Sequence, residues 1–389
     1  MNLLFPPLTA GLSNDLERLL SLIDKTFPLK QRFLAELPKN IGRLSALLTR
    51  ERSSLNGAYM SDPVLLNAYL RYFLPWNVFR LSRLLPALHL NGVLSAAGGV
   101  EIVDIGSGPL TFPVSLWIAL PELRAVPLRF LCIDQNSAAL DAGKKLFSAI
   151  AAENTWQIKT RRAALGERFT FAPAALFSAV NVCNELIQNM PQSDMEALNK
   201  TAKRLAHLFS NSTNGAGRVL LIEPGAPRPA QFLYFMRKAL IEQGFAPEAP
   251  CPAPEECPMR SGRRGQKWCH FSIDTDDAPA ELQKLSAKAL LPKEKVTLSF
   301  LLAAKGLQRK VEKDLLNVRV ISGAFSLPDS KTGRYACSEK GLTLLRGGKG
   351  LIEKYKEGVF FQAEAPYKSI RDAKSGALIL NVEDAPADV

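Results

Sequence analysis

The 389-residue chain lacks any long apolar run, which excludes one whole class of protein. A membrane-spanning helix needs about 20 consecutive apolar residues, and no stretch of the sequence approaches that length. The first twenty residues also lack the charged segment and small-residue cleavage site of a secretion signal, and they are too acidic for a mitochondrial presequence. The sequence therefore predicts a cytoplasmic protein with no membrane partner.

Cysteine is scarce, with six residues in the whole chain. A long chain without an export signal is expected to keep its thiols reduced, so no disulfide is predicted. Cys132 and Cys183 are interpreted as buried thiols of a hydrophobic core. The other four cysteines require a separate explanation, which is either metal binding or plain burial.

Acidic residues are in deficit, with 37 Asp+Glu against 49 Lys+Arg and a net charge of +12. Such an excess creates a field that attracts polyanions. Residues 281–360 alone contain sixteen Lys+Arg and eight Asp+Glu. The charge balance makes nucleic acid the first candidate partner, and a generic basic surface is the alternative.

With 47% apolar and 22% charged residues, the composition is that of a folded protein. The length of the chain predicts two or three domains. Helical periodicity predicts an N-terminal helical region over residues 1–97. Apolar strand-like runs then alternate with helical stretches, which predicts an α/β domain with a parallel sheet over residues 98–310. Short strand-like runs between turns rich in Gly and Lys predict a small basic β domain over residues 311–389.

Proline marks several boundaries in this scheme. Asp62 followed by Pro63 is typical of a helix start, and that helix is expected to end or kink at Pro75. Five prolines lie between Pro247 and Pro258, a density that excludes regular structure there. The sequence therefore predicts an irregular cysteine-rich loop over residues 246–270.

A glycine turn follows the first predicted strand, Val100 to Ile105. Small residues between a strand and a helix let the backbone approach a ligand at the helix N-terminus. The turn is not the P-loop of nucleoside triphosphatases, since no Gly-Lys-Ser/Thr follows. It also lacks the third glycine of the dinucleotide-binding motif. It resembles the first motif of class I S-adenosylmethionine-dependent methyltransferases, with Asp134 ending the next strand. This resemblance implies a Rossmann-like class I methyltransferase sheet.

Two polar residues follow the third predicted strand, where α/β sheets place their ligands. Asn184 and Glu185 do not belong to the Pro-Pro-aromatic motif of amino methyltransferases. Cys183 is not preceded by proline, as the cysteine of C5-cytosine methyltransferases is. We can therefore assign no base or nucleophile, so enzymatic activity stays open. The residues predicted to bind S-adenosylmethionine are Asp104, Gly106, Ser107, Gly108, Pro109, Asp134, Asn184 and Glu185.

Three cysteines, Cys251, Cys257 and Cys269, fall within nineteen residues of the proline-rich segment. Loop thiols at this spacing can converge on one metal ion or cluster. Cys337 is the remaining cysteine outside the sheet, and its participation would tie the C-terminal domain to the α/β domain. Sulfur ligands alone do not distinguish zinc from iron-sulfur.

A family resemblance narrows this choice. The segments Ala249-Pro250-Cys251-Pro252, Cys257-Pro258-Met259 and Lys267 to Ser272 resemble the methyltransferase-like family of mitochondrial small-ribosomal-subunit assembly factors and their bacterial relatives. Ile222-Glu223-Pro224-Gly225 and Ala68 to Pro75 are also similar to that family. The resemblance implies a [4Fe-4S] cluster on Cys251, Cys257, Cys269 and Cys337. It also implies that the small ribosomal subunit or its rRNA is the partner.

Four cations lie inside the Cys257 to Cys269 loop, and we predict that they contact nucleic-acid phosphates. They are Arg260, Arg263, Arg264 and Lys267. The favoured function is an RNA-binding assembly factor of methyltransferase fold with a structural cluster. One alternative is an active rRNA methyltransferase in which Asn184 or Glu185 positions a flipped base. The other is a zinc-binding RNA-binding protein without a nucleoside cofactor.

Overall fold

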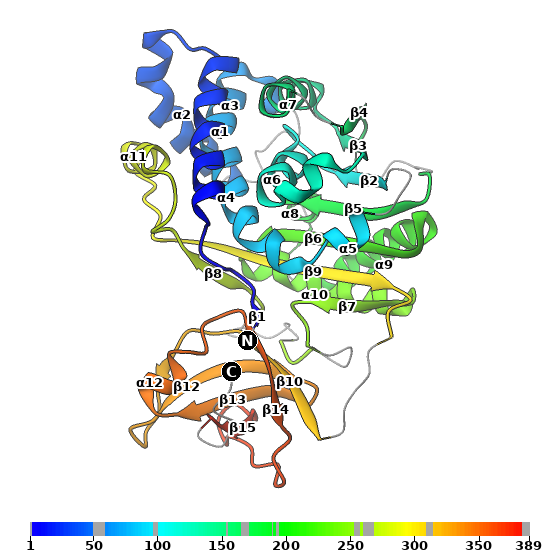
Figure 1. Cartoon of the computed structure of the whole chain (residues 1–389), viewed down its shortest axis with the longest axis vertical. Helices are drawn as coiled ribbons and strands as arrows, with labels where there is room; N and C mark the ends of the chain where they lie inside the picture. Colours follow the sequence, from blue (N-terminus) through cyan, green and yellow to red (C-terminus); the bar gives the residue numbers. More distant parts are fainter. Residues whose placement is uncertain are drawn as a thin grey trace.

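The computed structural model describes residues 2–49, 59–95, 100–152, 155–164, 171–188, 190–191, 194–252, 257–259, 268–308 and 314–382. A large sheet carries helices on both faces, and a second, smaller sheet lies beside it with both chain termini (Figure 1). The helices are α1 (Ala10–Thr26), α2 (Gln31–Thr49), α3 (Pro63–Ala68), α4 (Leu74–Leu84), α5 (Asn91–Leu94), α6 (Thr111–Ala119), α7 (Ser137–Ile150), α8 (Cys183–Leu186), α9 (Met195–Ser212), α10 (Pro227–Glu242), α11 (Ala280–Lys288) and α12 (Lys349–Ile352).

The large sheet has the strand order β4-β3-β2-β5-β6-β9-β7, with β8 paired to β9. Its strands are β2 (Val100–Ile105), β3 (Leu128–Asp134), β4 (Gln157–Arg162), β5 (Ala174–Val180), β6 (Thr213–Pro224), β7 (Phe245–Ala249), β8 (Phe271–Asp274) and β9 (Lys295–Lys305). Strands β2 to β6 pair in parallel, whereas β9 is antiparallel to both β6 and β7. The predicted Rossmann-like class I methyltransferase sheet is confirmed by this arrangement.

Alternate residues of the strands enter two separate cores, one on each face of the sheet. Ile102 packs with the N-terminal helices and α6, whereas Val103 packs with α9 and α10. Both faces are therefore buried, as expected for a parallel sheet covered by crossover helices. The strand order reverses between β2 and β5, and this switch point is where open α/β sheets bind ligands.

The prediction that no regular structure forms between Pro247 and Pro258 is wrong at its start. Residues Phe245–Ala249 form β7 and pair with β9, with a register shift between Pro247 and Ala249. The reason is position: β7 is the last strand of the sheet path, and an edge strand tolerates proline because one side of it needs no N–H donor.

The predicted helix start at Asp62 is confirmed, because the Asp62 side chain accepts a hydrogen bond from the Val64 N–H at 2.8 Å. The predicted end or kink at Pro75 takes the form of a π-helical turn, Tyr69–Phe73, between α3 and α4. Pro75 lies in the first turn of α4, which continues directly from the π-helical turn, and it lacks the N–H that would continue the α-helical hydrogen bonds there.

The small sheet has the order β1-β14-β10-β12-β13-β15, with β11 paired to β12. Its strands are β1 (Asn2–Leu3), β10 (Leu315–Val320), β11 (Phe325–Ser326), β12 (Thr332–Ser338), β13 (Gly341–Gly347), β14 (Val359–Glu364) and β15 (Leu378–Asn381). The N-terminal segment therefore adds a strand to the C-terminal domain, which a purely helical reading of residues 1–97 did not include. Residues 311–389 contain twelve Lys+Arg and eleven Asp+Glu, so the domain is nearly neutral rather than basic.

The N-terminal segment is fixed by one buried arginine of α4. The Arg83 guanidinium donates to the carbonyl of Pro6 at 2.5 Å and to the carboxylate of Asp277 at 2.8 Å. Asp277 also accepts from the Leu8 N–H at 3.0 Å. These bonds hold β1 at the contact between the two sheets. No helix among the described residues is both long and apolar enough to cross a bilayer.

Candidate functional site

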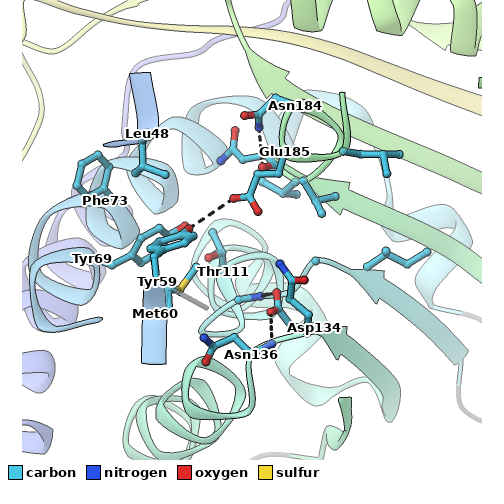
Figure 2. A pocket seen from close by; sticks show the side chains of 18 of the residues that line it. Leu48, Tyr59, Met60, Tyr69, Phe73, Thr111, Asp134, Asn136, Asn184 and Glu185 are labelled. Carbon is cyan, nitrogen blue, oxygen red and sulfur yellow. Dashed lines mark hydrogen bonds between the residues drawn. The ribbon is translucent and has the colours of Figure 1, made fainter. Parts of the chain in front are cut away.

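A cavity of about 530 Å³ opens at the carboxyl ends of the parallel strands, beside the N-terminal helices (Figure 2). Five of the residues predicted to bind cofactor line it, namely Gly106, Gly108, Asp134, Asn184 and Glu185. They come from the turn after β2, from the last residue of β3 and from α8, which follows β5. We call this cavity the crevice. Its volume is in the range of pockets that hold small-molecule ligands.

The glycine turn needs its glycines. Gly106 has φ +67°, and a Cβ there would lie 2.3 Å from Cγ2 of Val182. The Gly106 N–H donates to the carbonyl of Ile133 at 2.8 Å, and the Gly108 N–H donates to Oδ2 of Asp134 at 2.8 Å. The turn is thereby held against the end of β3, with its backbone at the crevice wall.

A glycine of another element, the helix α7, packs closely against the turn. Gly143 lies in α7, and a Cβ on it would be 2.5 Å from the backbone carbon of Pro109 and 2.6 Å from Cγ of Leu110. In the dinucleotide motif the third glycine allows a helix and a strand to pack closely. Here the same close approach is made by a helix that follows the next strand.

Asp104 supports the turn from below. It is 1% exposed and accepts hydrogen bonds from the hydroxyls of Ser107 and Ser178. Burial raises its pKa to about 7, against the lowering effect of the two hydroxyls. Asp104, Ser107 and Pro109 do not line the crevice, so the structure places these three predicted residues behind the turn, because β2 is the buried centre of the sheet.

Asp134 and Asn136 form the lower wall of the crevice in Figure 2. The Asp134 carboxylate accepts from the Gly108 N–H and, through Oδ1, from the Asn136 N–H at 2.8 Å. Burial raises the pKa of Asp134, and these backbone donors oppose the rise. Asn136, which the sequence analysis missed, caps α7 by accepting from the Ala139 N–H at 3.0 Å. A carboxylate set here can accept the hydroxyl hydrogens of a ribose.

Glu223 at the end of β6 positions the Asn184–Glu185 segment. It is fully buried and accepts from the backbone N–H groups of Cys183 at 2.8 Å and Asn184 at 3.1 Å. Burial raises its pKa to about 7, and the hydrogen bonds that it accepts lower it. The sequence analysis noted Glu223 only as part of a family resemblance, whereas the structure gives it a supporting role beneath the crevice.

This raised pKa makes the stability of the protein depend on pH. Unfolded Glu223 releases its proton near its ordinary value of 4.5, but folded Glu223 holds it until about 7. Burial of Glu223 therefore destabilises the fold progressively as pH rises through that window. We expect the free energy of unfolding of wild type, relative to Glu223→Gln, to fall by about 1.4 kcal/mol per pH unit there. Urea unfolding across the window measures it, with Glu242→Gln on α10 as control. If the free energies of unfolding of wild type and Glu223→Gln changed in parallel with pH, the raised pKa of Glu223 would be contradicted.

The N-terminal helices form the roof of the crevice, which the sequence analysis did not predict. Tyr69, Phe73, Asn77 and Arg80 all line it. Their spacing of four, four and three residues puts them on one helix face. A stripe of polar and aromatic side chains in an otherwise apolar segment was the available signal.

Arg80 anchors this roof to the sheet. Its guanidinium donates to Oδ1 of Asn181 at 2.8 Å and to the carbonyl of Thr297 at 2.9 Å. Burial lowers the pKa of Arg80 to about 10, and the nearby Glu223 carboxylate opposes this. Asn181 itself has φ +58°, a left-handed conformation at the crevice wall. Strained residues of this kind concentrate at functional sites.

The four cysteines predicted to bind metal line one small cavity of about 30 Å³. Cys251 and Cys257 follow β7, Cys269 precedes β8, and Cys337 lies in β12 of the other domain. We call this the cysteine site. No group of three or more Cys, His, Asp or Glu side chains among the described residues is arranged to hold a metal ion.

Electrostatics within the cysteine site follow from its burial. Burial raises the pKa of Cys337 and of Cys269, and in each case the neighbouring thiols raise it further. Arg237 of α10 lowers both pKa values. Arg237 and Arg319 are buried and line the cavity. The site therefore combines four thiols with two cations.

The predicted phosphate-binding cations Arg260, Arg263, Arg264 and Lys267 lie outside the described residues. Their interaction with RNA stays a prediction. Trp268, which follows them, donates from its indole N–H to the carbonyl of Gly225 at 3.0 Å.

Comparison with solved structures returns methyltransferases with low sequence identity. A putative class I S-adenosylmethionine-dependent methyltransferase from Listeria monocytogenes is 13% identical over 78% of this chain and 91% of its own, with a TM-score of 0.38. Magnesium protoporphyrin IX methyltransferase from Synechocystis, with bound SAH, is 12% identical over 60% of this chain and 84% of its own, with a TM-score of 0.36. No curated protein matches the chain.

The sequence profile of one family matches more than half of the chain. It is described as mitochondrial small ribosomal subunit Rsm22 and covers residues 98–327. This range contains the large sheet, the glycine turn and the first three cysteines of the cysteine site, and it ends before Cys337. The chain therefore belongs to the mitochondrial small ribosomal subunit Rsm22 family.

Proposed function

We propose that the protein is an RNA-binding assembly factor of the small ribosomal subunit. It binds S-adenosylmethionine in the crevice and carries a structural [4Fe-4S] cluster on Cys251, Cys257, Cys269 and Cys337. The observation that carries the proposal is the convergence of these four cysteines at the contact between the two domains, in a chain whose family belongs to the small ribosomal subunit.

Binding of S-adenosylmethionine is supported by the inner wall of the crevice. The glycine turn brings backbone to the cavity, and the Asp134 carboxylate lies beside it. An adenosine group needs these two features, a close backbone approach and a carboxylate acceptor for the ribose. Bound S-adenosylmethionine would supply an activated methyl group. The residues of this chain would orient it, with Asp134 and Asn136 at the nucleoside end.

The chemistry of the donor set supports an iron-sulfur cluster. The described wall of the cysteine site offers four thiols and no carboxylate or imidazole, and soft thiolate ligands select zinc and iron-sulfur clusters. Zinc and a [4Fe-4S] cluster can both take four thiolates. We propose the cluster because the segments around these cysteines resemble the family of small-ribosomal-subunit assembly factors.

Two buried cations support the same reading. Four thiolates on a [4Fe-4S] core leave a net negative charge, and buried charge is stable only when it is compensated. Arg237 and Arg319 line the cavity from α10 and β10. Both domains therefore supply thiols as well as compensating charge, which fits a cluster that fixes their relative position.

The proposal is tested by two measurements on the purified full-length protein. We expect it to cosediment with small-subunit particles at low salt, and less so as salt is raised, because phosphate contacts release counterions. We also expect calorimetry to detect binding of S-adenosylhomocysteine. Asp134→Asn should weaken that binding about 10-fold or more, since it removes charge-assisted hydrogen bonds.

Asp141→Asn is the matched control for this variant, because Asp141 is an exposed carboxylate on α7. It should bind S-adenosylhomocysteine like wild type. A wild-type protein that stays free of ribosomal particles would contradict the assembly role, and one that gives no heat with S-adenosylhomocysteine would contradict the cofactor assignment.

A further inference from the structure

The crevice has an outer part away from Asp134 and Asn136, the residues proposed for the nucleoside end of the cofactor. Glu185, which the sequence analysis predicted to bind the cofactor, lines this outer part. Asp134 and Asn136 lie at the lower end of the crevice, whereas Tyr69 and Phe73 lie at the opposite side, on the N-terminal helices (Figure 2). The rings of Tyr69 and Phe73 are 5.8 Å apart with an interplanar angle of 25°. We call these two rings the aromatic shelf. Both are half-buried, so part of each ring is accessible from the cavity.

The backbone that carries the shelf is unusual. Tyr69–Phe73 is a π-helical turn, and the Leu74 N–H donates to the carbonyl of Tyr69, five residues back. Pro75 has no N–H to continue the hydrogen bonds of an α-helix, which explains why the irregular turn falls here. Single π-helical turns are rare and frequently lie at functional sites. The irregular turn therefore begins and ends at the two residues whose rings line the crevice.

A carboxylate faces the shelf across the cavity. Glu185 lies in α8, and the hydroxyl of Tyr59 donates to its Oε1 at 3.5 Å. The neighbouring Asn184 side-chain amide donates to the carbonyl of Asn181 at 2.7 Å. An ionised carboxylate can only accept hydrogen bonds. A planar ligand lying on the shelf would thus be selected for a donor group at its edge.

A stacking surface beside a hydrogen-bond acceptor suits an unpaired nucleobase. Proteins that bind single-stranded RNA stack bases on aromatic side chains and read their edges by hydrogen bonds. The net charge of +12 favours the polyanion to which such a base is attached. An apolar peptide side chain would gain from the rings but would bring no donor of its own to the Glu185 carboxylate.

We infer that the outer crevice is a binding site for one unpaired RNA base with an exocyclic amino group, stacked on Tyr69 and Phe73 and recognised by Glu185. This inference rests on the proposed function, because it takes RNA as the partner. It adds a substrate class, a base with an exocyclic amino group (cytosine, adenine or guanine) rather than uracil, since the carbonyls that uracil carries instead are acceptors.

The test uses full-length protein saturated with S-adenosylhomocysteine. Labelled oligouridine strands with a central cytidine, uridine or abasic position are titrated and followed by fluorescence anisotropy. We expect the cytidine strand to bind more tightly than the other two. Phe73→Leu keeps apolar volume but removes the ring, and it should weaken binding of the cytidine strand by about 5- to 150-fold. Glu185→Gln should abolish the preference for cytidine over uridine.

Phe33→Leu on α2 is the matched control, because Phe33 is 39% exposed and lies away from the crevice lining. It should bind all strands like wild type, and a thermal unfolding curve like that of wild type shows that each variant is folded. Equal affinity of wild type and Phe73→Leu for the cytidine strand, with S-adenosylhomocysteine bound by both, would overturn this inference alone. Wild-type protein that binds neither S-adenosylhomocysteine nor any RNA would overturn the proposed function as well.

Discussion

Cys257→Ser is expected to yield colourless protein, whereas wild type purified without oxygen is expected to be brown and to contain about four irons per chain. The serine hydroxyl is a poor ligand for iron, so the variant loses one of the four thiolates that the cysteine site offers. Visible absorption together with iron and sulfide analysis measures the effect. Because the proposed cluster would join Cys337 to the large sheet, we also expect thermal unfolding of the variant to begin at a lower temperature.

A second buried thiol provides the control for this experiment. Cys132 is fully buried in β3, away from the cysteine site. Cys132→Ala should therefore keep the colour and the iron, although it loses some packing. Colourless wild type with one zinc per chain would favour the zinc alternative. Metal-free wild type would show that the four cysteines do not bind a metal.

Gly143→Ala is expected to weaken binding of S-adenosylhomocysteine about 10-fold or more. Its Cβ would lie 2.5 Å from the backbone of Pro109, so either α7 or the glycine turn must shift. A shift of the turn moves Gly106 and Gly108, whose backbone forms the crevice wall. Overpacking of this kind typically costs about 1–3 kcal/mol of stability. Calorimetry with S-adenosylhomocysteine and thermal unfolding measure the two effects.

Gly11→Ala on α1 separates the steric effect from helix propensity. A Cβ on Gly11 would have its nearest neighbour at 4.0 Å, and alanine is the better helix former by about 1 kcal/mol. This control should be neutral or slightly stabilising and should bind S-adenosylhomocysteine like wild type. If Gly143→Ala behaves in the same way, the close packing of α7 on the turn has no role in cofactor binding.

Local patterns in the sequence were sufficient for the centre of the large sheet. Apolar runs ending in glycine or acidic residues predicted β2, β3 and β6, because a buried parallel strand is apolar on both faces. The edge strand β4 was missed, since its sequence Gln157–Arg162 is polar and mostly exposed. Strand β7 was excluded on account of its prolines, which an edge position tolerates. Edge strands lack the burial that makes a strand visible in sequence.

The residues of the candidate site also fall into those that local sequence patterns predicted and those that they did not. The glycine turn and Asp134 were recognisable because their spacing along the chain follows from the geometry of one βαβ unit. Gly143, which packs on the turn, and Glu223, which holds α8, act across elements and have no local signature. The aromatic shelf lies about thirty residues before the turn in a region read only as helical.

The sequence by itself determined the class of the sheet, the position of the glycine turn and the membership of a family with a cysteine-rich segment. Each of these rests on residues that are close along the chain, where strand periodicity and turn chemistry act. Only the tertiary structure decided which helix covers the crevice, that β1 joins the C-terminal sheet, and that Cys337 reaches the other three cysteines. These contacts depend on the packing of whole helices and strands. The free energy that favours them comes from apolar surface buried between segments far apart in sequence.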